Sequence, residues 1–214
     1  MVKFVKITVL LLFSAIAVLA APEAMAGTKY PTITLTAKQQ ATVKKINGFL
    51  NSFQTLKSDF TQISSKGQMT QGILLISKPG KLRFDYAPPN PMLIVADGKW
   101  LTIKNRAKER GDQFPLSATP LRLVVSPQVD LLAETDVIGY ETKDGISSVS
   151  LADRKGSLGG YIILVFDEQR NELQQWIIVD GKDRRTTVQL ANLEMGGKFD
   201  PKLFIGKIDR PEGK

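Results

Sequence analysis

The sequence contains no cysteine and no histidine. The lack of cysteine excludes disulfide bonds, metal–thiolate sites and a cysteine nucleophile. We also expect no N-terminal lipid anchor, because such an anchor is attached to a cysteine. The lack of histidine excludes a Ser-His-Asp triad and the usual zinc sites. We therefore expect a protein without metal or cofactor, held together by packing and backbone hydrogen bonds.

Long hydrophobic runs are also scarce, and the one exception lies at the N-terminus. Lys3 and Lys6 precede an apolar run over residues 7–21, which is shorter than the roughly 20 residues that a membrane-spanning helix needs. Ala24 and Ala26 follow with the spacing of a signal-peptidase site. We interpret residues 1–26 as a secretory signal peptide and residues 27–214 as one exported, soluble domain.

The charge is positive but dispersed. Lysine and arginine number 29 against 21 acidic residues, which gives a formal net charge of +8. Positive residues alternate with negative ones along most of the chain, a balance that suits acidic partners or an anionic membrane surface. No nucleic-acid-binding motif is present, so we expect no nucleic acid partner.

An amphipathic helix is predicted at the start of the domain. Thr36 and Gln39 have the spacing of a capping box, which marks a helix N-terminus. Apolar residues then recur every three or four positions, as on one face of a helix: Val43, Ile46, Phe49, Leu50, Phe53 and Leu56. Asn47 and Asn51 fall on the polar side, so the helix needs an apolar surface to lie against.

From residue 58 onward the pattern changes to a period of two, which is typical of strands. Residues 81–86 alternate strictly, with Leu82, Phe84 and Tyr86 on one face. Turn signals separate successive strands: Pro79-Gly80, the pairs Asp97-Gly98, Asp144-Gly145 and Asp180-Gly181, and the connection 167–171. Sequential hairpins build a meander, and a long meander curls into a barrel or half-barrel.

Two short helical segments accompany the strands. Thr119-Pro120 resembles an N-cap followed by a proline at the first helical position, and Pro127 ends that segment. Residues 200–204 predict a last capped turn. The predicted fold is therefore α+β: an unclosed (half) antiparallel β-barrel with an N-terminal amphipathic helix and a short helical lid over its concave apolar face.

The concave face admits two interpretations. The helices could pack on it as an ordinary core, or they could cover a space that holds a ligand. We expect these residues to line it: Phe49, Phe53, Leu74, Ile76, Leu82, Phe84, Tyr86, Leu93, Val95, Trp100 and Leu123. Alternation selects only Leu82, Phe84 and Tyr86, because the other strands are apolar on both faces. Trp176 fits a simple core position equally well.

Residues 72–103, GILLISKPGKLRFDYAPPNPMLIVADGKWLTI, resemble the signature of the outer-membrane lipoprotein carrier (LolA) family. The matching elements are Gly72 at a strand start, Lys78-Pro79-Gly80, Leu82 with Phe84 in an alternating strand, and the hairpin 93–99. The opening helix, the helical insertion and the final turn follow in the family's order, so the resemblance covers nearly all of the domain.

This resemblance implies a function. A lidded, unclosed barrel in the periplasm would take up the acyl chains of lipoproteins that an inner-membrane ABC transporter releases, and would deliver them, as a monomer, to an outer-membrane acceptor. In the family the position of Lys78 is commonly arginine, which is thought to hold the lid shut through backbone carbonyls. Lys78 could do so more weakly, or share the role with Arg83. Alternatively, Lys78 is a solvated residue beside a turn.

Two other functions remain open at this point. An enzyme of this composition would need paired carboxylates such as Asp85 with Asp97 or Glu141. Nothing in the spacing favours such a pair, so we expect no catalytic residues. The second alternative keeps the fold and changes the ligand, giving a lipid or glycolipid binder or a domain that senses lipoproteins.

Overall fold

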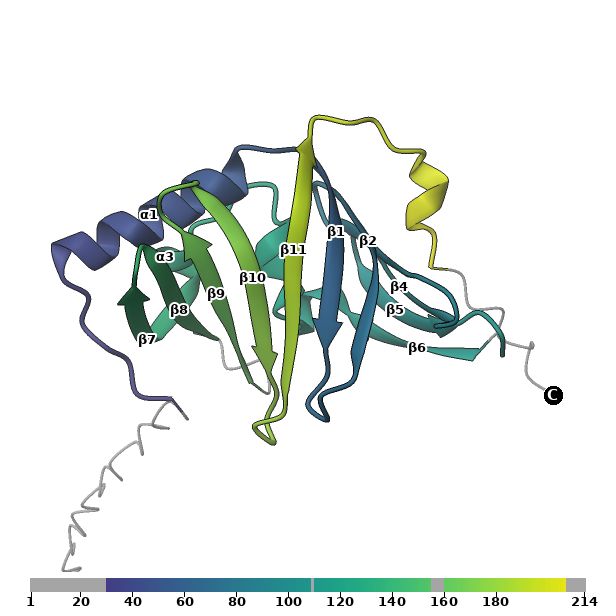
Figure 1. Ribbon diagram of the computed structural model, residues 1–214, viewed down its shortest axis with the longest axis horizontal. Helices are drawn as coiled ribbons and strands as arrows, with labels where there is room; N and C mark the ends of the chain where they lie inside the picture. Colours follow the sequence, from purple (N-terminus) through teal and green to yellow (C-terminus); the bar gives the residue numbers. More distant parts are fainter. Residues whose placement is uncertain (1–29, 109, 155–159, 207–214) are drawn as a thin grey trace, which may run out of the picture.

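A computed structural model describes residues 30–108, 110–154 and 160–206 of the chain (Figure 1). The signal peptide predicted at residues 1–26 lies outside this part. The helical elements are α1 (Ala37–Asn51), η1 (Leu116–Ala118), α2 (Leu121–Val125), α3 (Leu131–Glu134) and η2 (Pro201–Phe204). None of the described helices has the length and apolar character needed to cross a bilayer.

All strands of the described residues belong to one antiparallel sheet. They are β1 (Thr55–Ile63), β2 (Met69–Ser77), β3 (Lys81–Tyr86), β4 (Met92–Asp97), β5 (Trp100–Asn105), β6 (Arg110–Pro115), β7 (Thr135–Lys143), β8 (Ile146–Asp153), β9 (Tyr161–Asp167), β10 (Glu172–Val179) and β11 (Arg185–Met195). Their order is β6-β5-β4-β3-β2-β1-β11-β10-β9-β8-β7. Two meanders are thus joined where β1 pairs with β11. The edges β6 and β7 do not pair within the described residues, which confirms the predicted open half-barrel.

The predicted hairpins are confirmed, because Asp-Gly pairs supply the positive φ that tight turns need. β4 and β5 are joined at Gly98, with φ +105°, and β7 and β8 at Asp144 and Gly145, with φ 51° and +81°. The loop between β10 and β11 is longer, and the Asp180 carboxylate closes it by accepting hydrogen bonds from the Lys182 and Arg184 N–H groups.

The opening helix is shorter than its apolar pattern predicts. Thr36 and Gln39 form the expected capping box, with reciprocal bonds of 3.3 and 2.8 Å. The helix ends at Asn51, however, and the predicted helical residue Leu56 already belongs to β1. The extension was wrong because Leu56 is an inward position of a strand, and its spacing from Phe53 matches a helical repeat by coincidence.

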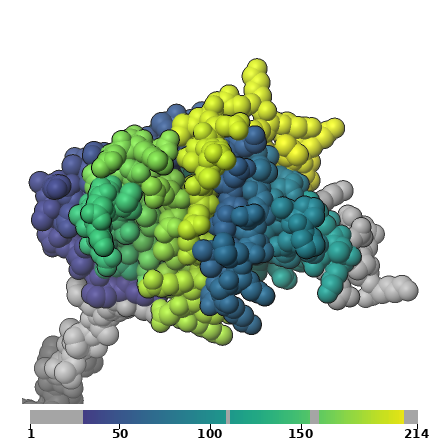
Figure 2. All heavy atoms as spheres, viewed as in Figure 1, coloured from purple at the N-terminus to yellow at the C-terminus, as the bar shows by residue number. Residues whose placement is uncertain are grey.

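Helical segments cover both faces of the curved sheet. In Figure 1, α1 runs past β7 to β10, and α2 lies behind the strands, on the concave side. The segment 116–134, which we call the lid, contains η1, α2 and α3 and connects the two sheet edges. Figure 2, which has the same view as Figure 1, shows the convex face of the sheet. Strands form its surface, and the C-terminal segment passes to one side. That segment places η2 against β3 and β4.

Candidate functional site

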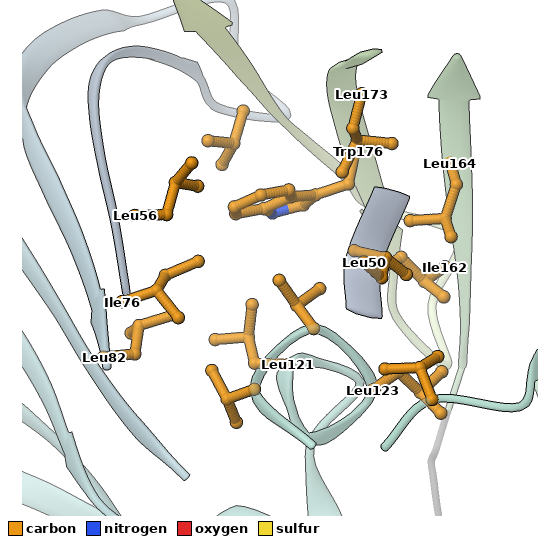
Figure 3. Packing of buried hydrophobic residues seen from close by; sticks show 14 of the residues in the cluster. Leu50, Leu56, Ile76, Leu82, Leu121, Leu123, Ile162, Leu164, Leu173 and Trp176 are labelled. Carbon is orange, nitrogen blue, oxygen red and sulfur yellow. The ribbon is translucent and has the colours of Figure 1, made fainter. Parts of the chain in front are cut away.

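The space between the sheet, α1 and the lid is filled by one apolar cluster. Figure 3 shows its centre, where Leu50 from α1 and Leu121 and Leu123 from α2 face side chains from strands of both meanders. All three are at least 94% buried, with exposed fractions of 0%, 6% and 1%. The concave face is therefore closed by packing between the sheet and the two helical covers.

Aromatic rings make up much of this interior. The Phe84 ring lies 5.0 Å from the Phe60 ring and 6.2 Å from the Trp176 ring, both edge-on. Phe49 of α1 meets Phe166 of β9 at 6.2 Å. Edge-to-face contacts are a preferred geometry for aromatic pairs, and here they link β3 with β1, β3 with β10, and α1 with β9.

Most of the predicted lining residues lie in this cluster. The structure places these eight there, each nearly fully buried: Phe49, Phe53, Leu74, Ile76, Leu82, Phe84, Tyr86 and Leu123. The Tyr86 hydroxyl donates to Gln62 Oε1 at 2.7 Å, and burial raises the pKa of Tyr86 to about 12. Whether these residues contact a ligand remains a prediction, because the observed contacts are with one another.

The prediction that Leu93, Val95 and Trp100 line the interior is wrong. Register pairs Leu93 with Asp85 and Val95 with Arg83, so both lie on the convex face. Trp100 precedes the inward Leu101 and is 38% exposed. Strand β4 is apolar on both faces because η2 covers its outer side, and an all-apolar strand carries no alternation that could fix its orientation. The inward residues there are Met92, Ile94 and Ala96.

Lys78 is buried at the end of α1. Its ammonium group donates a hydrogen bond to the Leu50 carbonyl and lies 4.5 Å from the centre of the Phe53 ring. The Leu50 carbonyl is one of the C-terminal carbonyls that a helix leaves without an internal partner. Burial lowers the pKa of Lys78 to about 8. With only 8% of its surface exposed, Lys78 is not the solvated residue of the alternative interpretation.

The same turn also contacts the lid. The Gly80 N–H donates to the Val125 carbonyl at the end of α2, at 2.8 Å. The segment Lys78-Pro79-Gly80 therefore binds the C-terminal ends of both helical covers, α1 through a side chain and α2 through the backbone. The role of Lys78 as a latch stays a prediction, but its contact is with α1 rather than with the lid.

The prediction that Arg83 shares the latch is wrong, because alternation places it on the convex face. Arg83 donates to the Leu203 carbonyl of η2 at 3.0 Å and pairs with Asp85 at 2.6 Å. Burial acts to raise the pKa of the Asp85 carboxyl, but Arg83 and Arg106 outweigh it and hold the pKa below its usual value. Asp85, which the enzyme alternative would use, is thus engaged in an ion cluster.

Two asparagines, which sequence reasoning left on the polar side of α1, bind the lid backbone. Asn51 accepts from the Val129 N–H at 2.8 Å and donates to the Val129 carbonyl at 2.9 Å. Asn47 accepts from the Leu131 N–H at 3.1 Å. The signal was available in the sequence, because residues four apart lie on the same side of a helix, but it did not indicate which segment they would meet.

At its other side the lid is held by ion pairs. Arg122 of α2 contacts Asp153 of β8 at 2.7 Å and Glu134 of α3 at 3.0 Å. Arg154 donates to the Leu132 and Ala133 carbonyls at the end of α3. Surface pockets of about 440 and 500 Å³ flank α2 and share Arg122 and Glu134 in their linings. These pockets lie at the lid rim, beside the filled interior.

This arrangement matches a known family over most of the chain. The family model described as outer membrane lipoprotein carrier protein LolA matches residues 51–207. The chain belongs to the LolA family. Curated proteins named outer-membrane lipoprotein carrier protein are similar to it. The Pseudomonas paraeruginosa protein is 28% identical over 83% of this chain and 88% of its own length. The Methylococcus capsulatus protein is 28% identical over 75% and 80%.

Two solved structures match the chain with low sequence identity and low TM-scores. A LolA superfamily protein from Nitrosomonas europaea covers 80% of this chain and 98% of its own, with 10% identity and a TM-score of 0.46. A putative outer membrane lipoprotein-sorting protein domain from Vibrio parahaemolyticus covers 76% and 94%, with 7% identity and a TM-score of 0.47. In this LolA-family chain, the described interior is closed.

Proposed function

We propose that this protein is a periplasmic carrier that shelters the acyl chains of lipoproteins under α1 and the lid, and moves lipoproteins from the inner to the outer membrane. The observation that carries the proposal is an apolar interior whose helical covers are held by a few polar contacts, in a chain of the lipoprotein carrier family. Such a function is binding and release, and it needs no catalytic group.

The physical need for such a carrier is large. At about 0.8 kcal/mol per CH₂ group, a single 16-carbon chain exposed to water costs on the order of 12 kcal/mol. A lipoprotein with several acyl chains would therefore leave its membrane too slowly without a protein that replaces the lipid environment. The clustered side chains of the concave face supply that environment.

Opening is compatible with the filled interior. When acyl chains displace α1 and the lid, the sheet exchanges apolar contacts with Leu50, Leu121 and Leu123 for apolar contacts with hydrocarbon. The large terms cancel, so the balance depends on the small polar ones, such as the Lys78 and Asn51 bonds. Closure that is only marginally favourable lets the carrier both accept and release its load.

Partners follow from this cycle. We propose that an inner-membrane ABC transporter loads the carrier and an outer-membrane acceptor unloads it. A monomer suits both steps, since the same opening has to face two partners in turn. Nucleic acid has no part in the cycle.

The identity of the cargo is tested by native mass spectrometry of the protein isolated from a periplasmic fraction. Complexes with triacylated proteins are expected. Free phospholipid or glycolipid alone would favour the alternative function, a lipid binder of the same fold.

The need for opening is tested by locking the covers with the variant Asn51→Cys/Val129→Cys. The natural chain has no cysteine, so the pair would carry the only thiols, and the Asn51 side chain reaches the backbone of Val129. The oxidised variant should lose lipoprotein binding and regain it on reduction. The two single-cysteine variants, treated with the same oxidant, are the controls. Full binding by the oxidised pair would contradict a mechanism that needs α1 and the lid to separate.

A further inference from the structure

Trp176 occupies the centre of the interior, on β10. It pairs with Val188 of β11 on one side and with Leu164 of β9 on the other, so β10 has a neighbouring strand on each side at this point. None of its surface is exposed. Figure 3 shows its indole ring pointing from β10 into the cluster, between the side chains of the two meanders.

The indole nitrogen of Trp176 has no hydrogen-bond acceptor among the described residues, although it is fully buried. An indole N–H can only donate. Other polar groups of the same interior are satisfied, since the Tyr86 hydroxyl reaches Gln62 and the Lys78 ammonium reaches the Leu50 carbonyl. A buried donor without an acceptor destabilises the state that contains it and is rare in folded proteins.

We propose that Trp176 Nε1 donates a hydrogen bond to a carbonyl oxygen of the acyl linkage in the bound ligand. This inference rests on the proposed function, and it deepens it by naming a polar contact for a site otherwise built from apolar groups. A hydrocarbon tail offers no acceptor. The ester or amide carbonyl at the head of an acyl chain is a strong acceptor, and it enters the interior together with that chain.

The consequence is selection for acyl linkages over alkyl ones. An ether-linked chain of the same length fills the same space but lacks the carbonyl, and its ether oxygen is a weaker acceptor that does not lie at the carbonyl position. Sites that hold a buried polar group reject analogues that lack its partner far better than apolar pockets reject a change in size. The carrier should therefore distinguish acyl from alkyl lipids even though their hydrocarbon chains are equally hydrophobic.

The test compares two synthetic lipopeptides that share one peptide and carry two 16-carbon chains, linked as esters in one and as ethers in the other. The protein should bind the ester form roughly tenfold more tightly, since one hydrogen bond to a buried donor contributes about that factor. In Trp176→Phe, which keeps an aromatic ring and removes the donor, the two lipopeptides should bind equally. Trp100→Phe, on the convex face, should keep the preference.

A second measurement uses the unaltered protein. The chain has two tryptophans, so the indole region of an ¹⁵N-correlated NMR spectrum contains two signals, which Trp100→Phe assigns. The Trp176 indole proton should move further downfield with the ester lipopeptide than with the ether lipopeptide. This readout does not depend on whether Trp176→Phe folds.

The outcomes separate the two proposals. Equal binding of both lipopeptides by the unaltered protein, or an ester preference that survives in Trp176→Phe, would overturn the role of Trp176 and leave the carrier function standing. Binding of neither lipopeptide would overturn the carrier function, and the role of Trp176 with it.

Discussion

Each face of the sheet carries a helical cover: α1 and the lid on the concave face, and η2 on the convex face. On both faces a basic side chain donates to a backbone carbonyl of the cover, but the concave one is in apolar surroundings and the convex one among charges. On the concave face Lys78 donates to the Leu50 carbonyl of α1, and on the convex face Arg83 donates to the Leu203 carbonyl of η2. Lys78 is packed against the Phe53 ring and forms no ion pair within the described residues. Arg83 lies in an ion cluster with Asp85 and Arg106.

This difference suits two kinds of attachment. The convex cover, η2, is fixed by charged side chains whose contacts a hydrophobic ligand cannot replace. The concave cover has ion pairs at the rim of the lid, but over the interior it is held by apolar packing and a lysine without a counter-charge, and an acyl chain can replace those apolar contacts. We infer that the concave cover is the one that moves and the convex cover stays in position during the transport cycle.

The largest test truncates one phenylalanine at the centre of the concave face and one at its edge, where Phe114 of β6 pairs with Leu101. Phe84→Ala should lower the free energy of unfolding by about 3–5 kcal/mol, because it leaves a cavity beside Phe60 and Trp176. Phe114→Ala should change it by less than about 0.5 kcal/mol, because Phe114 is 45% exposed. Urea denaturation of both variants measures the two values. Similar losses would mean that the concave cluster is no better packed than the rim.

A smaller effect is expected from glycine. A Cβ added at Gly72 would lie 2.1 Å from the Asp85 carbonyl oxygen, so Gly72→Ala should destabilise the protein by about 1–3 kcal/mol through overpacking. Gly48, on the exposed side of α1, has nothing within 4 Å. Gly48→Ala should stabilise it by about 1 kcal/mol, because glycine is a poor helix former. Thermal unfolding compares the pair, and a stabilised Gly72→Ala variant would refute the close approach of β2 and β3.

The next test removes one basic residue from each face. Lys78→Leu should change the rate of lipoprotein transfer about tenfold, the factor associated with one lost hydrogen bond, because it weakens the closed form. Arg83→Leu should leave the transfer rate unchanged, although it should raise hydrogen exchange in η2. Transfer from donor membranes to a purified acceptor is the assay. Unaltered transfer by Lys78→Leu would mean that Lys78 is not a latch.

The last test is a pH dependence. Lys78 has a pKa of about 8 in the folded protein, against an ordinary value of 10.5. Between these values the unfolded chain binds a proton that the folded chain has released, so the Lys78 contribution to stability rises from pH 8 to 10.5 and is constant below pH 8. The difference in unfolding free energy between the natural protein and Lys78→Leu should rise over that range. A flat difference would place Lys78 in solvent.

The sequence predicted the strands well where one face is polar. Residues 81–86 alternate, and Leu82, Phe84 and Tyr86 all lie inward. It did not predict the orientation of Leu93 and Val95, because η2 covers the outer side of β4 and removes the polar half of the pattern. That cover comes from residues 201–204, far along the chain, and no local periodicity records it.

The polar contacts of the lid were even harder to predict from the sequence. Asn47 and Asn51 have ordinary surface positions on α1, and only the tertiary structure brings residues 129–131 against them. Their side chains recognise backbone groups, which every residue carries, so the partner segment leaves no matching signal in its composition. Trp176 shows the same limit, since a core and a ligand-facing tryptophan have the same neighbours in the sequence.

The number of strands has a consequence for the chain path. The described part of the chain has eleven strands that alternate in direction across the sheet. Because eleven is odd, the first and last strands of the sheet, β6 and β7, run parallel. Strands that run parallel cannot be joined by a tight turn, so the chain that leaves β6 has to return along the whole opening before it enters β7. Residues 116–134, the lid, form this connecting segment. With one strand more or fewer the two edges would run antiparallel, and the connecting segment could cross from one edge to the other without also returning along the strand direction.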